Sequence, residues 1–104
     1  MIKKLNSLAV IILNYNSSEL SINAAKNILN LETGAKIIVV DNCSTDNSQE
    51  TLDRELGNIE NVYLEFSKSN KGYAAGNNIG IRAAEKLEAD TVLIMNPDIE
   101  VPDA

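Results

Sequence analysis

The chain has 104 residues, enough for one domain with a single modest core. Its 15 acidic and 9 basic residues give a net charge of −6, which argues against a nucleic-acid partner because no basic stripe exists to neutralise phosphates. The chain has no histidine and one cysteine, Cys43, which excludes an internal disulfide, Ser-His-Asp and Cys-His catalysis, and a histidine-containing zinc site.

The first apolar run, residues 8–13, predicts a strand that is covered on both faces. The run is too short to span a bilayer, and Asn14-Tyr15-Asn16 follows where a signal peptide would carry small residues. We therefore expect a strand and a cytoplasmic chain. A helical pattern then runs from Ser18 to about Leu31 and ends at Thr33-Gly34. Its apolar positions are Leu20, Ala24, Ile28 and Leu31.

Residues 37–40 predict a second buried strand, and the turn at 44–48 is rich in residues that begin helices. The helix that follows carries Leu52 and Leu56 and ends at Gly57. Further along, the pattern predicts a strand at 61–66, a helix from about 74 to 87 and a strand at 91–95.

This β-α-β-α-β-α-β order with short connections predicts one domain over 1–104, an α/β chain of three layers (α/β/α) with a parallel or mostly parallel sheet. Ligands of such sheets bind beyond the carboxyl ends of the strands. Polar residues gather at those ends and predict a binding site there. They are Asn14-Tyr15-Asn16, Asp41-Asn42, Asn70-Lys71-Gly72 and Asn96-Pro97-Asp98.

Two aspartates follow buried strands. Asp41 accepts hydrogen bonds from a base or ribose, or it forms the turn at 44–46; the sequence leaves both readings open. Asp46 and Ser48 are expected to serve the start of the next helix. Asp98 follows the last strand, where one carboxylate with diphosphate oxygens and water suits Mg²⁺ or Mn²⁺.

The segment 70–78 is a glycine-containing loop that enters a helix, so its backbone amides are candidates for binding a phosphate. Its small residues are equally compatible with close packing of the helix on the sheet. Tyr15 is expected either to stack on a base or to pack at the rim of the fold. Cys43 is expected to be a passive small residue, since no cationic neighbour favours its thiolate.

Four segments in order resemble family 2 glycosyltransferases of the GT-A fold over essentially the whole chain. They are the strand and Tyr-Asn pair at 10–16, the strand, acidic residue and Ser-Thr-Asp turn at 37–48, the glycine and asparagine loop at 70–80, and Leu93-Ile94-Met95-Asn96-Pro97-Asp98, where the family carries its Asp-x-Asp metal motif. Asn96 replaces the first aspartate of that motif, and the form Asn-Pro-Asp resembles the rhamnosyltransferase-like branch.

The resemblance implies transfer of a sugar, with inversion, from a nucleoside diphosphate to an acceptor hydroxyl, with Mg²⁺ or Mn²⁺ as cofactor. It implies UDP- or dTDP-linked donors, hexosyl or rhamnosyl transfer, and a role in cell-wall or polysaccharide synthesis, at the inner face of the membrane for a longer parent enzyme. Asp98 would hold the metal. The other residues expected to contact the donor are Asn14, Tyr15, Asn16, Asp41, Asn70, Lys71, Gly72, Asn78 and Asn96.

In this family the general base lies downstream, in a half that also binds the glycan or lipid-linked acceptor. We therefore expect these 104 residues to bind donor and metal but to transfer sugar poorly alone, since a positioned base contributes about 10²–10⁴-fold. Apolar surface that the other half would cover predicts self-association. The alternatives are a nucleotide-binding or regulatory α/β module, a dinucleotide domain without its glycine fingerprint, and a non-catalytic interaction domain.

Overall fold

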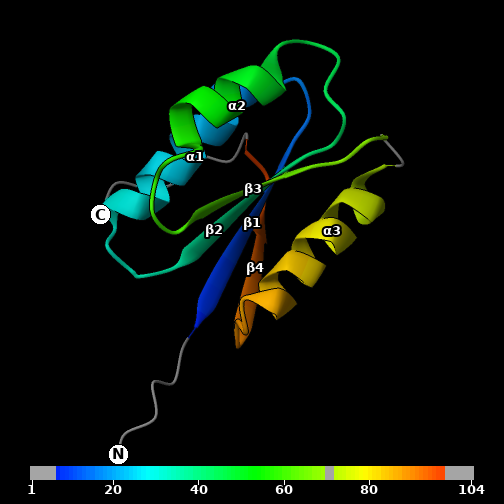
Figure 1. Cartoon of the computed structure of the whole chain (residues 1–104). Helices are drawn as coiled ribbons and strands as arrows, with labels where there is room; N and C mark the ends of the chain where they lie inside the picture. The colour runs from blue at the N-terminus through cyan, green and yellow to red at the C-terminus, as the bar shows by residue number, and fades with distance from the viewer. Residues whose placement is uncertain (1–6, 70–71, 98–104) are drawn as a thin grey trace, which may run out of the picture.

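The computed structural model describes residues 7–69 and 72–97. In this region of the chain, four parallel strands form one sheet and three helices connect them (Figure 1). The elements are β1 (Leu8–Asn14), α1 (Ser18–Asn30), β2 (Lys36–Asp41), α2 (Ser48–Leu56), β3 (Val62–Phe66), α3 (Tyr73–Lys86) and β4 (Thr91–Met95). The predicted order of strands and helices is confirmed, and the parallel sheet with it.

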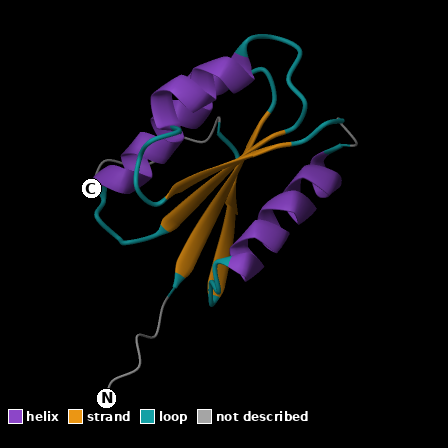
Figure 2. Cartoon of the chain, viewed as in Figure 1, coloured by secondary structure: helices purple, strands orange, loops and turns teal. Residues whose placement is uncertain are grey.

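The sheet has the strand order β3-β2-β1-β4, so β1 and β2 lie in its centre and β3 and β4 form its edges. Helices α1 and α2 cover one face, and α3 lies against the other (Figure 2). This is the predicted three-layer α/β/α arrangement. Parallel strands need crossover connections, and each helix supplies one.

Residues of the two central strands alternate between two apolar clusters, one on each face of the sheet. One cluster joins β1 and β2 to α1 and α2 and contains Val10, Ile12, Ile37, Val39, Leu52 and Leu56. The other joins the same strands to α3 and contains Ile11, Ile38, Val40 and Ala84. The central strands are continuous apolar runs because both of their faces are buried.

The buried face of α1 matches the predicted one in part. Ala24 and Ile28 are buried as predicted, Leu20 and Leu31 are exposed, and Ser21 and Ile22 are buried in addition. The apolar pattern missed part of this face because a polar residue, Ser21, occupies it and bonds to a strand-end side chain described below. The helix ends at Asn30 with Leu31 as its C-cap, which agrees with the expected end at about Leu31.

Two glycines bring α3 unusually close to β1. A Cβ on Gly80 would lie 2.6 Å from Cγ2 of Ile11, and a Cβ on Gly76 would lie 2.4 Å from Cδ1 of Leu13. Gly76 is thus explained by close packing of the helix on the sheet, one of the two readings left open above. Gly80 allows the same close approach at the next turn of the helix.

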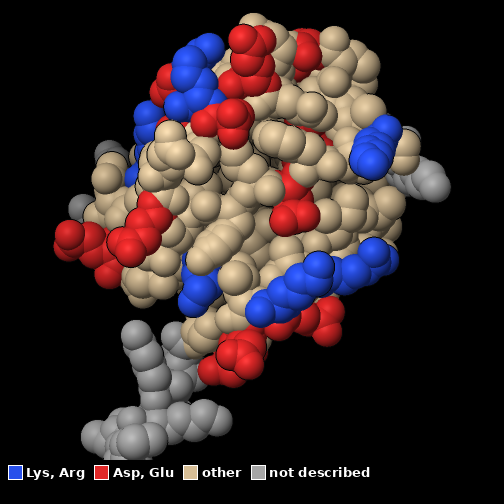
Figure 3. Space-filling model, viewed as in Figure 1, with Lys and Arg blue, Asp and Glu red and all other residues tan. Residues whose placement is uncertain are grey.

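The surface of the described residues is mixed in charge. Figure 3 shows acidic and basic side chains interspersed over the face in view, with broad uncharged areas between them. Within the described residues, no helix combines the length and the apolar character that crossing a bilayer requires.

Replacing Gly80 by Ala should destabilise the fold. We expect the free energy of unfolding to fall by about 1–2 kcal/mol, because overpacking against the buried Ile11 exceeds the roughly 1 kcal/mol that alanine gains in helix propensity. Urea unfolding measures the change. Glu85→Ala, at an exposed position of the same helix, is the control and should stay within about 0.5 kcal/mol of wild type. A Gly80→Ala variant as stable as wild type would contradict the close packing.

Candidate functional site

The carboxyl ends of the strands meet at one end of the sheet, the upper end in Figure 1. This end is called the carboxyl edge below, as distinct from the edge strands β3 and β4. In the parallel register, Asn14 of β1 lies beside Asp41 of β2, and Asp41 lies beside Phe66 of β3. On the other side of β1, Ile12 lies beside Met95, so the chain leaves β4 at the same edge. The strand-end residues singled out from the sequence therefore converge where the structure describes them.

Asp41 is fully buried at the centre of this edge, and both of its carboxylate oxygens accept hydrogen bonds from protein donors. Oδ1 accepts from Asn14 Nδ2 at 2.8 Å and from the Ser44 hydroxyl. Oδ2 accepts from the Ser44 amide at 3.0 Å and from Gln49 Nε2 at 2.8 Å. A strand, a turn and a helix thus converge on one carboxylate. This is the turn-forming reading of Asp41, and a base or ribose would reach these oxygens only by displacing a donor.

The hydrogen bonds keep the Asp41 carboxylate ionised. Burial is the largest single influence and raises the pKa of the carboxyl group. The bonds from the Ser44 hydroxyl and amide, then from Asn14 and Gln49, act in the opposite direction and together outweigh it. The pKa of Asp41 therefore lies below its ordinary value.

Asn14 extends this network into α1. Its Oδ1 accepts a hydrogen bond of 2.7 Å from the Ser21 hydroxyl, while its Nδ2 donates to Asp41. Asn14 and Ser21 are both fully buried, so each amide atom of Asn14 has a protein partner. The structure shows Asn14 as a link between β1, β2 and α1.

The Asn16 side chain forms hydrogen bonds with the loop between β2 and α2, residues 42–47. Its Oδ1 accepts from the amides of Thr45 at 2.9 Å and Asp46 at 3.2 Å, and its Nδ2 donates to the Thr45 hydroxyl at 3.0 Å. The Asn16 backbone has φ of 51°, a left-handed conformation that asparagine tolerates well. Loop 42–47 is therefore fixed by side chains from the end of β1, its own turn and α2.

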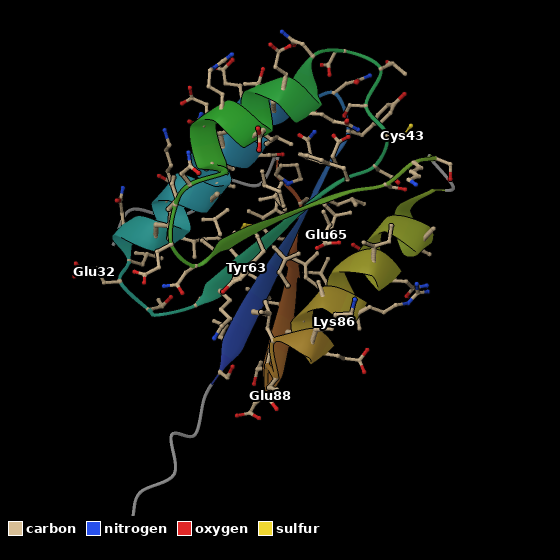
Figure 4. The ribbon with its side chains drawn as sticks, in the orientation of Figure 1. Glu32, Cys43, Tyr63, Glu65, Lys86 and Glu88 are labelled. Carbon is tan, nitrogen blue, oxygen red and sulfur yellow. The ribbon has the colours of Figure 1, made fainter. Side chains whose placement is uncertain are left out.

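The loop also contacts the beginning of α3. Asn42 Nδ2 donates to the carbonyl oxygen of Gly72 at 3.3 Å, across thirty residues of sequence. Gly72 has φ of 93°, which favours glycine, and no atom lies within 4 Å of the position that a Cβ would occupy. Cys43, a half-buried free thiol, lies on this loop (Figure 4). The first turn of α3 and loop 42–47 are thus neighbours at the carboxyl edge.

The remaining predicted site residues lie on the surface or outside the described region of the chain. Tyr15, Gly72, Asn78 and Asn96 are exposed. Asn70, Lys71 and Asp98 lie outside the described residues. The prediction that Asp46 serves the start of α2 is confirmed, because its Oδ1 accepts a hydrogen bond of 2.8 Å from the Ser48 amide.

Ser44 was predicted only as part of the turn that Asp41 forms, and it donates to the Asp41 carboxylate. Sequence reasoning missed two members of the site: Gln49 binds the Asp41 carboxylate, and Ser21 orients Asn14. Ser21 and Gln49 carried no signal in the sequence, because only the packing of α1 and α2 on the sheet brings them to this edge.

No cluster of three or more acidic or cysteine side chains suited to a metal ion occurs in residues 7–69 and 72–97. A magnesium or manganese ion needs no such cluster where a substrate diphosphate supplies most of its ligands. Asn96 directly follows β4 and so lies at the carboxyl edge.

A model of the family described as "Glycosyl transferase family 2" matches residues 9–104. The chain is also similar to the low-salt glycan biosynthesis hexosyltransferase of Haloferax volcanii, with 35% identity over 99 residues. That match covers 93% of this chain and 29% of the relative. The chain thus spans less than a third of the length of this relative.

Two solved structures share the fold. The mannosyltransferase PcManGT from Pyrobaculum calidifontis, in complex with GDP-Man and Mn2+, superposes with a TM-score of 0.81 at 23% identity, over 94% of this chain and 29% of that one. TarS 1-349 of S. aureus gives a TM-score of 0.61 at 24% identity, over 88% of this chain and 27% of that one. At these identities the likeness concerns the fold alone.

Asp41→Asn tests the buried carboxylate through the pH dependence of stability. A pKa depressed by folding contributes stability above the unfolded value of about 4, and this contribution disappears as pH falls through the folded pKa. We expect the variant to be about 2 kcal/mol less stable than wild type at pH 7, with the difference shrinking below about pH 4. Urea unfolding of both proteins from about pH 2.5 to 7, roughly the range in which carboxyl groups titrate, measures the difference in stability.

The matched control is Glu60→Gln, which removes an exposed carboxylate. It should change stability by less than about 0.5 kcal/mol across the range. A constant difference between Asp41→Asn and wild type down to the lowest pH would contradict the stabilising role of the charge.

Proposed function

Because the chain belongs to glycosyl transferase family 2, we propose that its carboxyl edge binds the nucleoside diphosphate moiety of a sugar donor. The observation that carries this proposal is the convergence, at one edge, of the loop fixed on Asp41, the exposed Tyr15 and the first turn of α3. Together they offer a rigid loop, an aromatic ring and backbone amides. These are the groups that a nucleoside and its phosphates require.

The beginning of α3 is the proposed neighbour of the phosphates. The first amides of a helix lack intrahelical partners, and no described side chain caps those of α3. The positive end of the helix dipole favours an anion there. Gly72 leaves open space where a side chain would otherwise stand, so the backbone is accessible. Asn70, Lys71 and Asn78 are proposed to assist from the same segment.

Asp41 supports this site through the loop. Its four protein donors leave no free lone pair for a ligand, so we assign the base contacts to the groups that the loop presents and to Tyr15. Asn14 and Asn16 act in the same indirect way, because their amide groups hold Asp41 and loop 42–47. A preformed loop lowers the entropy that is lost when the donor binds.

Asp98 is the proposed metal ligand. It follows Asn96 and Pro97 beyond β4, and Mg²⁺ or Mn²⁺ held there would neutralise the charge of the leaving diphosphate. The mannosyltransferase that shares the fold is described with GDP-Man and Mn2+. A guanosine donor therefore joins the uridine and deoxythymidine donors as a candidate, and Mn²⁺ remains a candidate beside Mg²⁺.

We further propose that the complete reaction is inverting transfer of a hexose or rhamnose to a glycan or lipid-linked hydroxyl, in the cytoplasm, where the free thiol of Cys43 stays reduced. The described carboxylates at the edge are poor general bases, since Asp41 is buried with lowered pKa and Asp46 bonds to the Ser48 amide. The base and the acceptor site are assigned to residues outside the described ones.

Nucleotide titration tests the donor site. UDP, dTDP and GDP are titrated by calorimetry with and without Mn²⁺, against wild type and Asp98→Ala. We expect binding that strengthens at least about tenfold with Mn²⁺, and loss of that gain in Asp98→Ala, because the ion bridges carboxylate and diphosphate. Asp90→Ala is the matched control, since this exposed aspartate lies at the amino end of β4.

Three outcomes would decide against elements of this proposal. A nucleotide affinity that is the same with and without Mn²⁺ would favour a metal-independent nucleotide-binding module. Equal loss in Asp98→Ala and Asp90→Ala would assign the effect to overall charge. The absence of binding by any of the three diphosphates would contradict the donor site itself.

Tyr15→Ala tests base stacking separately. Stacking of a base on an aromatic ring contributes about 1–3 kcal/mol, so the affinity for the preferred diphosphate should fall about tenfold or more. Tyr15→Phe keeps the ring and should bind nearly as wild type. Because Tyr15 is exposed, both variants should unfold at the wild-type urea concentration. Equal affinities in Tyr15→Ala and wild type would exclude the stacking role.

A further inference from the structure

The side chain of Asn77, in the second turn of α3, is a buried amide that the fold does not use. Only 9% of this residue is exposed, and its Oδ1 is shielded from solvent without accepting a hydrogen bond. Such an oxygen costs folding free energy, because the hydrogen bonds that it would make to water are lost without replacement. The Ser48 hydroxyl is also unpartnered, but Ser48 is fully buried, whereas Asn77 borders the surface. An asparagine here therefore calls for a reason other than stability.

Asn77 lies on the flank of α3 that faces β4. The two glycines of this helix, Gly76 and Gly80, face β1, and Ile79 lines a surface hollow together with Glu65 of β3. An α-helix turns by about 100° per residue, so Asn77 and Ile79 fall on opposite sides of the line through the glycines. Since Ile79 faces β3, Asn77 faces the other edge strand, β4, which α3 also contacts.

The side chain of Asn77 leans toward the carboxyl edge. Helix α3 runs antiparallel to the strands, and its first turn lies at this edge, where Gly72 meets Asn42 (Figure 1). In an α-helix each Cα–Cβ bond tilts toward the amino terminus, so a side chain of the second turn lies over the first. The unpartnered amide therefore lies beside the backbone amides that no side chain caps. Two independent features that favour a ligand coincide there.

The unpartnered atom is a hydrogen-bond acceptor, and this restricts the ligand. Phosphate oxygens are also acceptors, so they suit the amides of the first turn but not Oδ1 of Asn77. The hydrogen-bond donors of a nucleotide sugar are the N–H groups of its base and the hydroxyl groups of its ribose and its sugar. The base is assigned above to Tyr15 and loop 42–47, which follow β1 and β2, whereas Asn77 faces β4. A hydroxyl group near the phosphates is thus the fitting partner.

From these observations we propose that Asn77 selects the transferred sugar, because its Oδ1 accepts a hydrogen bond from a hydroxyl group of that sugar. The inference rests on the donor site proposed above, in which the phosphates lie at the start of α3 and the sugar is bonded to the second of them. Turning the amide toward this hydroxyl breaks no hydrogen bond of Oδ1, since it has none. An exposed asparagine would first have to give up its bonds to water, so the buried one gains more from the contact.

Asn77→Leu tests whether the oxygen is unsatisfied, because leucine keeps the branched shape of the side chain without its polar atoms. The urea midpoint of unfolding should rise further than in Asn27→Leu, the matched control. Asn27 is an exposed asparagine inside α1, so its replacement reports the gain in helix propensity alone. Asn77→Leu makes the same gain and also removes a buried unsatisfied group. A midpoint below that of Asn27→Leu would overturn the inference.

Calorimetric titration with matched pairs of ligands tests the contact itself. The pairs are GDP with GDP-mannose, UDP with UDP-glucose and dTDP with dTDP-glucose, each with Mn²⁺. In Asn77→Leu, the affinity for the nucleotide sugar should fall about five- to tenfold, the loss expected for one hydrogen bond, while the affinity for the diphosphate stays within about twofold. Asn77→Ala should show the same selective loss, because a smaller side chain excludes steric blocking as its cause. Asn27→Leu should bind both ligands as wild type does.

Nucleotide sugars with one hydroxyl replaced by fluorine identify the group that Asn77 binds. Fluorine cannot donate a hydrogen bond, so one analogue of the series should bind wild type as weakly as the parent sugar binds Asn77→Leu. The same analogue should lose no further affinity in Asn77→Leu, since the two changes remove one shared contact. Independent, additive losses for every analogue would overturn the direct contact.

The outcomes separate this inference from the donor site on which it rests. If the diphosphates bind and Asn77→Leu weakens no nucleotide sugar selectively, this inference is wrong and the donor site remains. An equal loss for the diphosphate and its sugar would assign the contact to the ribose and would overturn the sugar contact. If none of the three diphosphates binds wild type, the donor site is wrong and this inference with it.

Discussion

The buried carboxylate of Asp41 is the interaction on which the carboxyl edge of the sheet depends. It lies at the end of a central strand, away from water, and burial alone would favour its protonation. Four hydrogen bonds from Asn14, Ser44 and Gln49 reverse that preference. Each of these three residues belongs to a different element, so the charge persists only while β1, loop 42–47 and α2 keep their places. Removing one donor would leave the buried charge incompletely satisfied, which costs more than the bond itself contributes.

A second constraint acts on the other face of the sheet, at the neighbouring strand β1. Gly76 and Gly80 let α3 approach Ile11 and Leu13 of β1, and β1 also carries Asn14. The position of the first turn of α3 is therefore set by packing, and the position of loop 42–47 by hydrogen bonds. The bond from Asn42 to the Gly72 carbonyl joins the two. A donor that spans loop and helix would meet groups already held in place, which favours binding by preorganisation.

The sequence predicted the elements well because their signals are local. Four apolar runs, separated by helical patterns and turn residues, determine a parallel α/β sheet, and the last strand, 91–95, was predicted with its observed bounds. The site was only partly predictable, because its contacts join residues far apart in the chain. Asn14 and Asp41 are 27 residues apart, and only the register of β1 against β2 makes them neighbours. That register also decides that Asp41 has its full set of partners, which no local pattern indicates. Part of the buried face of α1 was missed for a similar reason, since Ser21 is buried through a bond to a strand.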